Sequence, residues 1–211
     1  MTVWKKTIKM SYTRQEFVQK YGDFINDEIK GTGILAGTLI AQAIIESQGK
    51  VNGSWRVGAS TLSQKANNYF GIKAYGGWKG KTFNIETGEY TPQGVYYKEK
   101  ATFRAYDSVE DSIRDYIKFL QENQRYAKAG VFEAKTVQEQ ASRLKDAGYA
   151  TSPTYANTVT SVFKGVEKYI PAPKGNSGSE NNLKGGAKIF WWIIPIIGVG
   201  IAGLIIGLSK N

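Results

Sequence analysis

The stretch from Leu35 to Gly49, LAGTLIAQAIIESQG, constrains the fold most, because it predicts an apolar helix that needs burial. Its apolar residues recur at helical spacing, as at Ala36, Leu39, Ala43 and Ile44. Its single carboxylate, Glu46, stands just before the expected end of the helix. There the helix dipole and the loss of hydration would both raise the pKa of Glu46, as a general acid requires. A surface glutamate at a helix end is the alternative interpretation.

The composition excludes several classes of enzyme. The chain of 211 residues contains neither Cys nor His, so it offers no Cys nucleophile, no Ser-His or Cys-His pair and no thiolate or imidazole zinc site. Its formal net charge of +10 favours polyanions such as nucleic acid, anionic lipid or an acidic cell wall. The sequence shows no nucleic-acid-binding motif, so we expect no nucleic-acid partner. The 13 Tyr and 5 Trp residues suit a site for sugar rings, with a packed aromatic core as the alternative.

The chain divides into a folded part and an apolar tail. Residues 1–10 carry Lys but no apolar run, so they are expected to form an N-terminal extension and not a signal peptide. A domain is expected over 11–170, followed by a flexible polar linker over 171–188. Residues 189–208 form an uncharged apolar run, which at about 1.5 Å per residue spans roughly 30 Å. We therefore expect a single C-terminal transmembrane helix, a short tail at 209–211 and a membrane location.

Periodicity and capping signals predict a mostly helical domain with one hairpin. The capping box Thr13-x-x-Glu16 begins a helix, which Gly31 and Gly33 end. Two β-rich runs at 81–90 and 95–104 flank a turn sequence at 91–94, so they predict a hairpin. Three more helices are expected to begin at Asp107-x-x-Glu110, Thr136-x-x-Glu139 and Ser152-Pro153.

The segment between the apolar helix and the hairpin is irregular and rich in Gly, Asn and aromatic residues. It includes NNYFGIKAYGGWKG at 67–80. Loops of this composition commonly carry binding groups on a scaffold. We therefore predict substrate contacts from Asn68, Phe70 and Trp78, and from Gln42 on the apolar helix.

Five blocks of the chain occur in the order and spacing of a known enzyme family. They are AQAIIESQGK, NNYFGIKAYGGWKG, ETGEY, FRAYDSVEDSIRDY and GYATSPTYA. Over about residues 11–169 the chain thus resembles glycoside hydrolase family 73, the bacterial and phage endo-β-N-acetylglucosaminidases of peptidoglycan. The resemblance implies an α+β, lysozyme-like fold, in which a cleft separates a mostly helical lobe from a β-hairpin lobe. It also implies cleavage of the GlcNAc-β-1,4-MurNAc bond in peptidoglycan glycan strands.

The resemblance assigns the two catalytic carboxyl groups. Glu46 falls on the family's catalytic general acid, which protonates the leaving oxygen. Glu89 matches the second catalytic carboxylate, on the hairpin. Gly88 would loosen that arm, and Glu86 is the fallback.

The resemblance also implies two tyrosines that position sugar, Tyr149 before A-T and Tyr155 in the following P-x-Y-A. Ser152 stands where the family has the Asp of Y-A-T-D-P. This replacement would affect a structural cap more than the catalytic chemistry.

Glycoside cleavage agrees with the composition, since it needs one protonated and one ionised carboxyl group and neither metal nor His. We therefore expect no cofactor. Inverting, retaining and substrate-assisted mechanisms stay open. A non-catalytic wall-binding or phage virion structural protein with the same fold is the alternative from another class, and a muramidase is the nearer one.

The charge around the apolar tail bears on localisation. Lys is more frequent on the N-terminal side of 189–208, which predicts a cytoplasmic domain, whereas peptidoglycan lies outside. A phage lysin kept from the wall until lysis, or a lytic protein in a membrane-containing virion, would resolve this conflict. Export with the N-terminus outside is the other solution. The expected location is therefore the bacterial inner membrane or the membrane of a phage particle.

Overall fold

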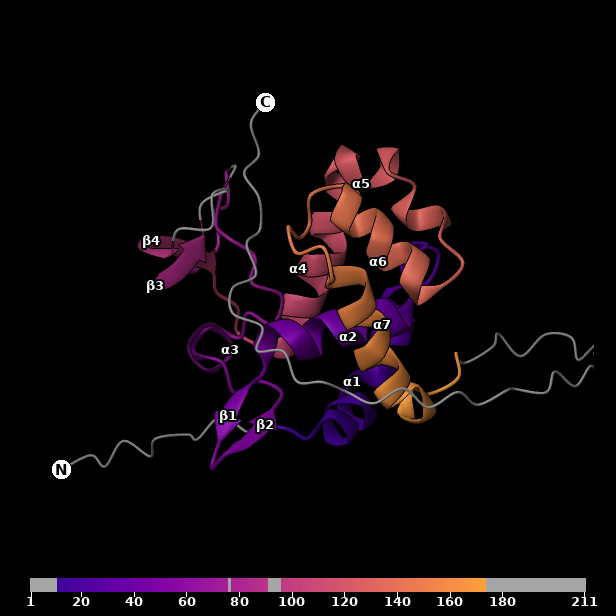
Figure 1. Ribbon diagram of the computed structural model, residues 1–211, viewed down its shortest axis with the longest axis horizontal. Coiled ribbons are helices and arrows are strands. Elements are labelled where there is room, and N and C mark those ends of the chain that lie inside the picture. The colour runs from indigo at the N-terminus through magenta and orange to yellow at the C-terminus, as the bar shows by residue number, and fades with distance from the viewer. Residues whose placement is uncertain (1–10, 76, 91–95, 174–211) are drawn as a thin grey trace, which may run out of the picture.

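A helical body with two β-hairpins on one side makes up the part of the chain that the computed structural model describes, residues 11–75, 77–90 and 96–173 (Figure 1). For 87–90 and 96–99 this description covers the backbone. The elements in order are α1 (Arg14–Glu28), α2 (Ala36–Ser47), β1 (Gly49–Val51), β2 (Ser54–Arg56), α3 (Thr61–Ala66), β3 (Thr82–Tyr90), β4 (Tyr96–Arg104), α4 (Val109–Glu122), α5 (Gln124–Lys128), η1 (Val131–Glu133), α6 (Val137–Asp146), α7 (Tyr155–Val166) and η2 (Glu167–Tyr169).

Helix α2 lies at the centre of the body, as its sequence predicts. It packs against α1, α6 and α7, and the side chains of Leu39, Ile40 and Ile44 are fully buried. Gly37 permits the close approach of α7, because a Cβ atom there would lie 2.6 Å from the ring of Phe163. A helix that is apolar on nearly all sides is stable only in such a position.

Most of the predicted helix starts are confirmed, and two are wrong by a residue or two. Thr13 forms the full capping box with Glu16, and Thr136 accepts a hydrogen bond from the backbone N–H of Glu139. Helix α4 is capped by Ser108 and not by Asp107, whose carboxylate pairs with a lysine instead.

The last helix, α7, also begins slightly later than expected. Thr154 stands at its N-cap position, and the Ser152 hydroxyl accepts a hydrogen bond from the backbone N–H of Thr154.

The predicted hairpin is confirmed as β3 and β4. The strands pair antiparallel, from Thr82 opposite Arg104 to Tyr90 opposite Tyr96. The turn predicted at 91–94 lies outside the described residues.

A second hairpin, β1–β2, and the short helix α3 occupy the segment that was expected to be irregular. Asn52 and Gly53 both have positive φ angles, 49° and 80°, as a tight two-residue hairpin turn of type I′ requires. Ser60 caps α3. Figure 1 shows both hairpins on the same side of the helical body, with α3 between them.

The expected transmembrane segment, 189–208, and most of the linker lie outside the described residues. Within 11–75, 77–90 and 96–173, helices both long and apolar enough to cross a bilayer are absent.

Candidate active site

Glu46 lies in the last turn of α2, at the end that points toward the two hairpins (Figure 1). Its Oε1 atom is buried and has no hydrogen-bond partner among the described residues. Loss of hydration raises the pKa of Glu46 from its ordinary value of 4.5 to about 8. The carboxyl group is therefore mostly protonated at neutral pH, as the sequence analysis predicts for a general acid.

Ser47 fixes the end of α2 next to this carboxyl group. Its hydroxyl donates to the Ala43 carbonyl at 2.6 Å and accepts from the backbone N–H of Gly58 at 3.0 Å. Its carbonyl accepts from the backbone N–H of Ser60 at 2.9 Å and from the Ser63 hydroxyl at 3.3 Å. These bonds join the helix end to the segment that follows β2.

Gln42 lies one helical turn before Glu46 and connects two other helices. Its Nε2 donates to the Tyr155 hydroxyl on α7 at 2.6 Å, and its Oε1 accepts from the Tyr116 hydroxyl on α4 at 2.5 Å. All three side chains are buried. Gln42 therefore orients two tyrosines on the face of α2 that continues toward the carboxyl group.

Tyr149 completes this group of tyrosines. Its ring centroid lies 6.0 Å from that of Tyr116 and 5.8 Å from that of Tyr155. Its hydroxyl is buried without a hydrogen-bond partner among the described residues. Burial raises the pKa of Tyr116, Tyr149 and Tyr155 well above the ordinary value, and Glu46 adds to this because its negative charge opposes that of a phenolate. The tyrosines are therefore hydroxyl groups at all ordinary pH values.

The structure thus brings four of the predicted site residues together, Gln42, Glu46, Tyr149 and Tyr155. It adds Tyr116, which the sequence alone does not mark as a site residue. In the sequence, Tyr116 belongs to the apolar stripe of α4 and reads as an ordinary core residue. The signal for its role is its hydrogen bond, which only the folded chain shows.

Asn68 and Phe70 support the loop before the hairpin from inside. The Asn68 amide nitrogen donates to the carbonyls of Ile72 and Arg104, and its Oδ1 accepts from the backbone N–H groups of Phe70 and Ile72. Phe70 is fully buried and stacks on Tyr116 with ring centroids 4.1 Å apart. These packed side chains have essentially no surface for a sugar, so the predicted direct contacts are corrected to a supporting position.

Trp78 is half-buried and covers the base of the hairpin. Its Nε1 donates to the Lys81 carbonyl at 2.9 Å, and the Arg104 guanidinium lies 4.5 Å from its ring centroid. Arg104 in turn donates to both Asp115 carboxylate oxygens, at 3.0 and 2.9 Å, and the Tyr106 hydroxyl donates to the same carboxylate at 2.6 Å. This polar group joins β4 to α4.

The two hairpin acids both belong to β3, but the structure describes the side chain of Glu86 alone. Glu86 is exposed and lies opposite Lys100. The side chain of Glu89 lies outside the described part of the chain.

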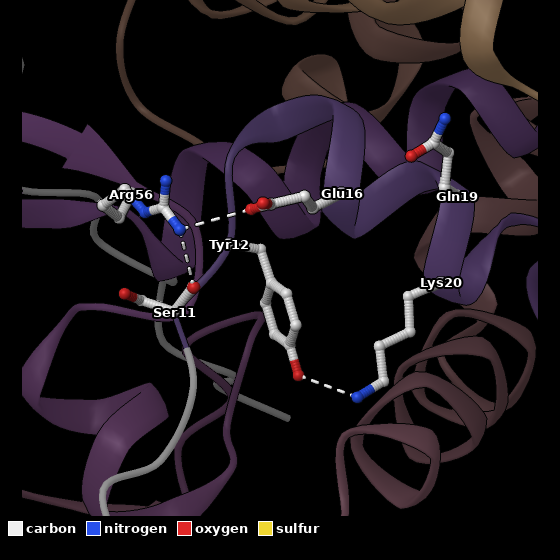
Figure 2. Close-up of a pocket in the computed structure, with 6 residues that line it drawn as sticks. All are labelled: Ser11, Tyr12, Glu16, Gln19, Lys20 and Arg56. Atoms are coloured by element: carbon white, nitrogen blue, oxygen red, sulfur yellow. Dashed lines mark hydrogen bonds and ion pairs between the residues drawn. The ribbon is translucent and has the colours of Figure 1, made fainter.

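Glu46 is not among the residues that line two surface hollows of the described part of the chain. The larger, of about 540 Å³, lies between the start of α1 and the end of β2 (Figure 2). It is lined by Ser11, Tyr12, Glu16, Gln19, Lys20 and Arg56. The smaller, of about 480 Å³, is lined by Asn84, Ile85, Glu86 and Lys100 on the hairpin. The described residues contain no group of three or more acidic residues that could hold a metal ion.

Comparison with known proteins identifies the family. Residues 22–168 match the family described as "Glucosaminidase: Mannosyl-glycoprotein endo-beta-N-acetylglucosaminidase". The chain belongs to the glucosaminidase family. The predictions of a glycoside hydrolase and of its family are therefore confirmed.

Curated relatives of this glucosaminidase domain include peptidoglycan hydrolases. FlgJ of Escherichia coli strain K12, named as one, is 37% identical over 135 residues, which cover 63% of the chain and 40% of FlgJ. Exo-glucosaminidase LytG of Bacillus subtilis is 36% identical over 139 residues, covering 64% of the chain and 44% of LytG. The chain thus spans less than half the length of these relatives.

Solved structures share the fold. A peptidoglycan hydrolase mutant from Sphingomonas sp. A1 has a TM-score of 0.60 and 29% identity, covering 74% of this chain and 97% of that one. The catalytic domain of the autolysin Auto from Listeria monocytogenes also has a TM-score of 0.60, with 28% identity, covering 77% of this chain and 91% of that one. The predicted mixed helical and β-hairpin, lysozyme-like domain is thereby confirmed.

Proposed function

We propose that the chain is a peptidoglycan hydrolase that cleaves the β-1,4 bond following N-acetylglucosamine, with Glu46 as the general acid. The observation that carries this proposal is the buried carboxyl group of Glu46, whose pKa is raised to about 8 and whose Oε1 has no hydrogen-bond partner in the described part of the chain. A carboxyl group that holds its proton at neutral pH and leaves an oxygen unused is suited to protonate a leaving glycosidic oxygen.

The tyrosines beside Glu46 support the same chemistry. Gln42 holds Tyr116 and Tyr155 by hydrogen bonds, and the buried Tyr149 hydroxyl has no partner among the described residues. Glu46 Oε1 and the Tyr149 hydroxyl are thus both buried without a hydrogen bond among the described residues. Such atoms lower the free energy of unfolding unless a ligand forms the missing hydrogen bonds. Tyr149 and Tyr155 are as buried as Asn68 and Phe70, so we assign both tyrosines to supporting Glu46 from inside the fold, with Gln42 holding Tyr155. Their contact with a sugar stays a prediction.

Glu89 is the proposed second carboxylate. The support is the family resemblance, in which Glu89 matches the second catalytic carboxylate; Glu86, the fallback, is exposed and lies opposite Lys100. A glycosidase needs one ionised carboxylate across the bond from its acid, as a base or as a nucleophile. The anomeric form of the first product, followed by NMR, distinguishes inverting from retaining or substrate-assisted cleavage.

The substrate class follows from the family and from named relatives. FlgJ is named a peptidoglycan hydrolase and LytG an exo-glucosaminidase. We propose an endo-acting enzyme, because the predicted substrate is an internal bond of the glycan strand. Mass spectrometry of the products separates the two modes, since an exo-acting enzyme releases only small end products.

We also propose that residues 189–208 anchor the domain in a membrane. The support is the uncharged apolar sequence, long enough to span a bilayer, after a polar linker. The Lys residues before 189–208 predict a cytoplasmic domain, whereas peptidoglycan lies outside the membrane. This conflict favours a phage-related lysin or virion protein. Proteolysis from outside intact cells tests the orientation: digestion of the domain would contradict a cytoplasmic location.

The deciding experiment compares wild type with Glu46→Gln on purified peptidoglycan, after borohydride reduction of the products. Wild type should release strands with reduced N-acetylglucosamine ends. Glu46→Gln should release at least about a hundredfold fewer of these strands. Glu122→Gln, which changes an exposed glutamate on α4, is the matched control and should match wild type. Reduced muramic acid ends would show a muramidase, and a folded wild type that binds without cleaving would show a non-catalytic protein.

A further inference from the structure

The β1–β2 hairpin carries an exposed tryptophan that the proposed active site does not use. Trp55 is 57% exposed, the largest exposed fraction among the large apolar side chains of the described residues. Lys50 lies directly opposite on β1, with its Nζ 5.5 Å from the indole ring centroid. The pair presents a flat apolar ring and a positive charge at one spot of the surface.

This hairpin is held in one conformation by several independent contacts. Its two-residue turn uses the positive φ angles of Asn52 and Gly53. Beyond β2, Val57 and Tyr12 exchange two backbone hydrogen bonds of 2.8 and 2.9 Å. Arg56 donates to the Ser11 carbonyl and to Glu16, as Figure 2 shows. A ring on a rigid support loses little conformational entropy when it binds a ligand.

The hairpin also starts close to the catalytic acid. Lys50 follows Glu46 by four residues, so at most about 14 Å separates their Cα atoms. The β1–β2 and β3–β4 hairpins lie on the same side of the body (Figure 1). The β1–β2 hairpin therefore lies within the length of a glycan strand that is bound at Glu46 and extends over several sugar rings.

We propose that Trp55 and Lys50 form an additional glycan-binding subsite, which binds the peptidoglycan strand beyond the bond that is cleaved. The indole ring stacks on the C–H face of a sugar ring, and the Lys50 ammonium pairs with a carboxylate that the strand or its peptide carries. This inference rests on the proposed function, because it takes the glycan strand as the ligand.

The hairpin geometry favours a glycan over a lipid surface. Val51 is the other exposed apolar residue of the hairpin, at 41%, but it neighbours Lys50 on β1 and therefore points to the opposite face of the ladder. Trp55 and Val51 thus do not form the continuous apolar patch that insertion into a membrane requires.

The test uses the purified full-length chain in mild detergent and measures co-sedimentation with peptidoglycan sacculi. Trp55→Ala should weaken apparent binding about tenfold, and Trp55→Tyr, which keeps a stacking ring, should restore it to within about threefold of wild type. Val51→Ala, on the other face of the same hairpin, is the control and should bind as wild type does. KM for sacculi should rise about tenfold in Trp55→Ala with kcat unchanged, while cleavage of a soluble tetrasaccharide fragment stays unchanged.

Three results would overturn the proposal. Trp55→Ala could bind sacculi as wild type does, or it could lose activity equally on the tetrasaccharide, which would show damage to the active site itself. It could also lose binding to vesicles of phosphatidylglycerol and phosphatidylcholine while keeping its binding to sacculi, which would show a membrane contact. Binding that depends on Trp55 in a protein without hydrolytic activity would support the subsite and refute the proposed function.

Discussion

The burial of the Glu46 carboxyl group makes a quantitative prediction about stability and pH. Replacing Glu46 with Gln keeps the shape of the side chain and removes its titration. In the unfolded chain the carboxyl group ionises near 4.5, and in the folded chain near about 8. Between these values the folded state holds a proton that the unfolded state has lost, so the free energy of unfolding of wild type falls as pH rises.

The size of the effect follows from the interval between the two values. It is about 3.5 pH units, and each unit corresponds to about 1.4 kcal/mol, which gives about 3 to 5 kcal/mol in total. The stability contributed by the protonated group is fully present below pH 4.5 and is lost as pH rises to about 8. Glu46→Gln should therefore differ little from wild type near pH 4.5 and become more stable than wild type above pH 8 by that amount.

The assay is urea unfolding of the full-length chain at several values of pH between 4.5 and 9, followed by tryptophan fluorescence. The measured quantity is the difference in free energy of unfolding between Glu46→Gln and wild type at each pH. Glu122→Gln, at an exposed position of α4, is the control and should show a difference that does not change over this range. If the difference for Glu46→Gln is equally flat, the carboxyl group is hydrated and the argument for a buried acid is wrong.

Three further predictions concern the hairpin acids, the Gln42 bridge and the Arg104–Asp115 pair. Glu89→Gln should lower the release of reducing ends from peptidoglycan at least about a hundredfold, whereas Glu86→Gln should stay within about twofold; the reverse order would move the second carboxylate to Glu86. Gln42→Leu leaves two buried tyrosine hydroxyls without this partner, so the free energy of unfolding, measured by heat or urea, should fall by about 2–4 kcal/mol. A fall of less than about 0.5 kcal/mol would refute the hydrogen-bonded bridge. Asp115→Ala leaves Arg104, whose side chain is 16% exposed, without its carboxylate partner, which should cost about 3–5 kcal/mol by the same measurement; replacing both partners should cost less.

The sequence contained the local features of this fold and lacked the long-range ones. Capping at Thr13 and the two β-rich runs that form β3 and β4 depend on neighbouring residues, and both were predicted correctly. Asn52-Gly53 is a strong hairpin signal, but the strands beside it are three residues long and carry Lys, Ser and Arg, so no apolar alternation marks them. The segment was therefore expected to be irregular.

The candidate site could be predicted only where a motif carried it. Glu46 was selected from its place in an apolar helix and from the family resemblance, and the structure gives the physical reason, which is loss of hydration. Tyr116 could not be selected, because its partner Gln42 lies 74 residues away in the chain and the hydrogen bond exists only after folding. Asn68 and Phe70 were placed in the right loop, but composition does not show which side of a loop a side chain faces.

The bonds around Ser47 have a practical consequence for anyone who wishes to alter substrate preference. Gly49 is as confined as its neighbours, since a Cβ atom there would lie 2.6 Å from the Ala59 carbonyl oxygen. Libraries that vary Ser47 and Gly49 should therefore yield mostly misfolded clones. Diversity placed at Lys50 and Trp55, on the exposed face of the hairpin proposed to bind the glycan, leaves the geometry of the acid intact, so new specificities are best sought there.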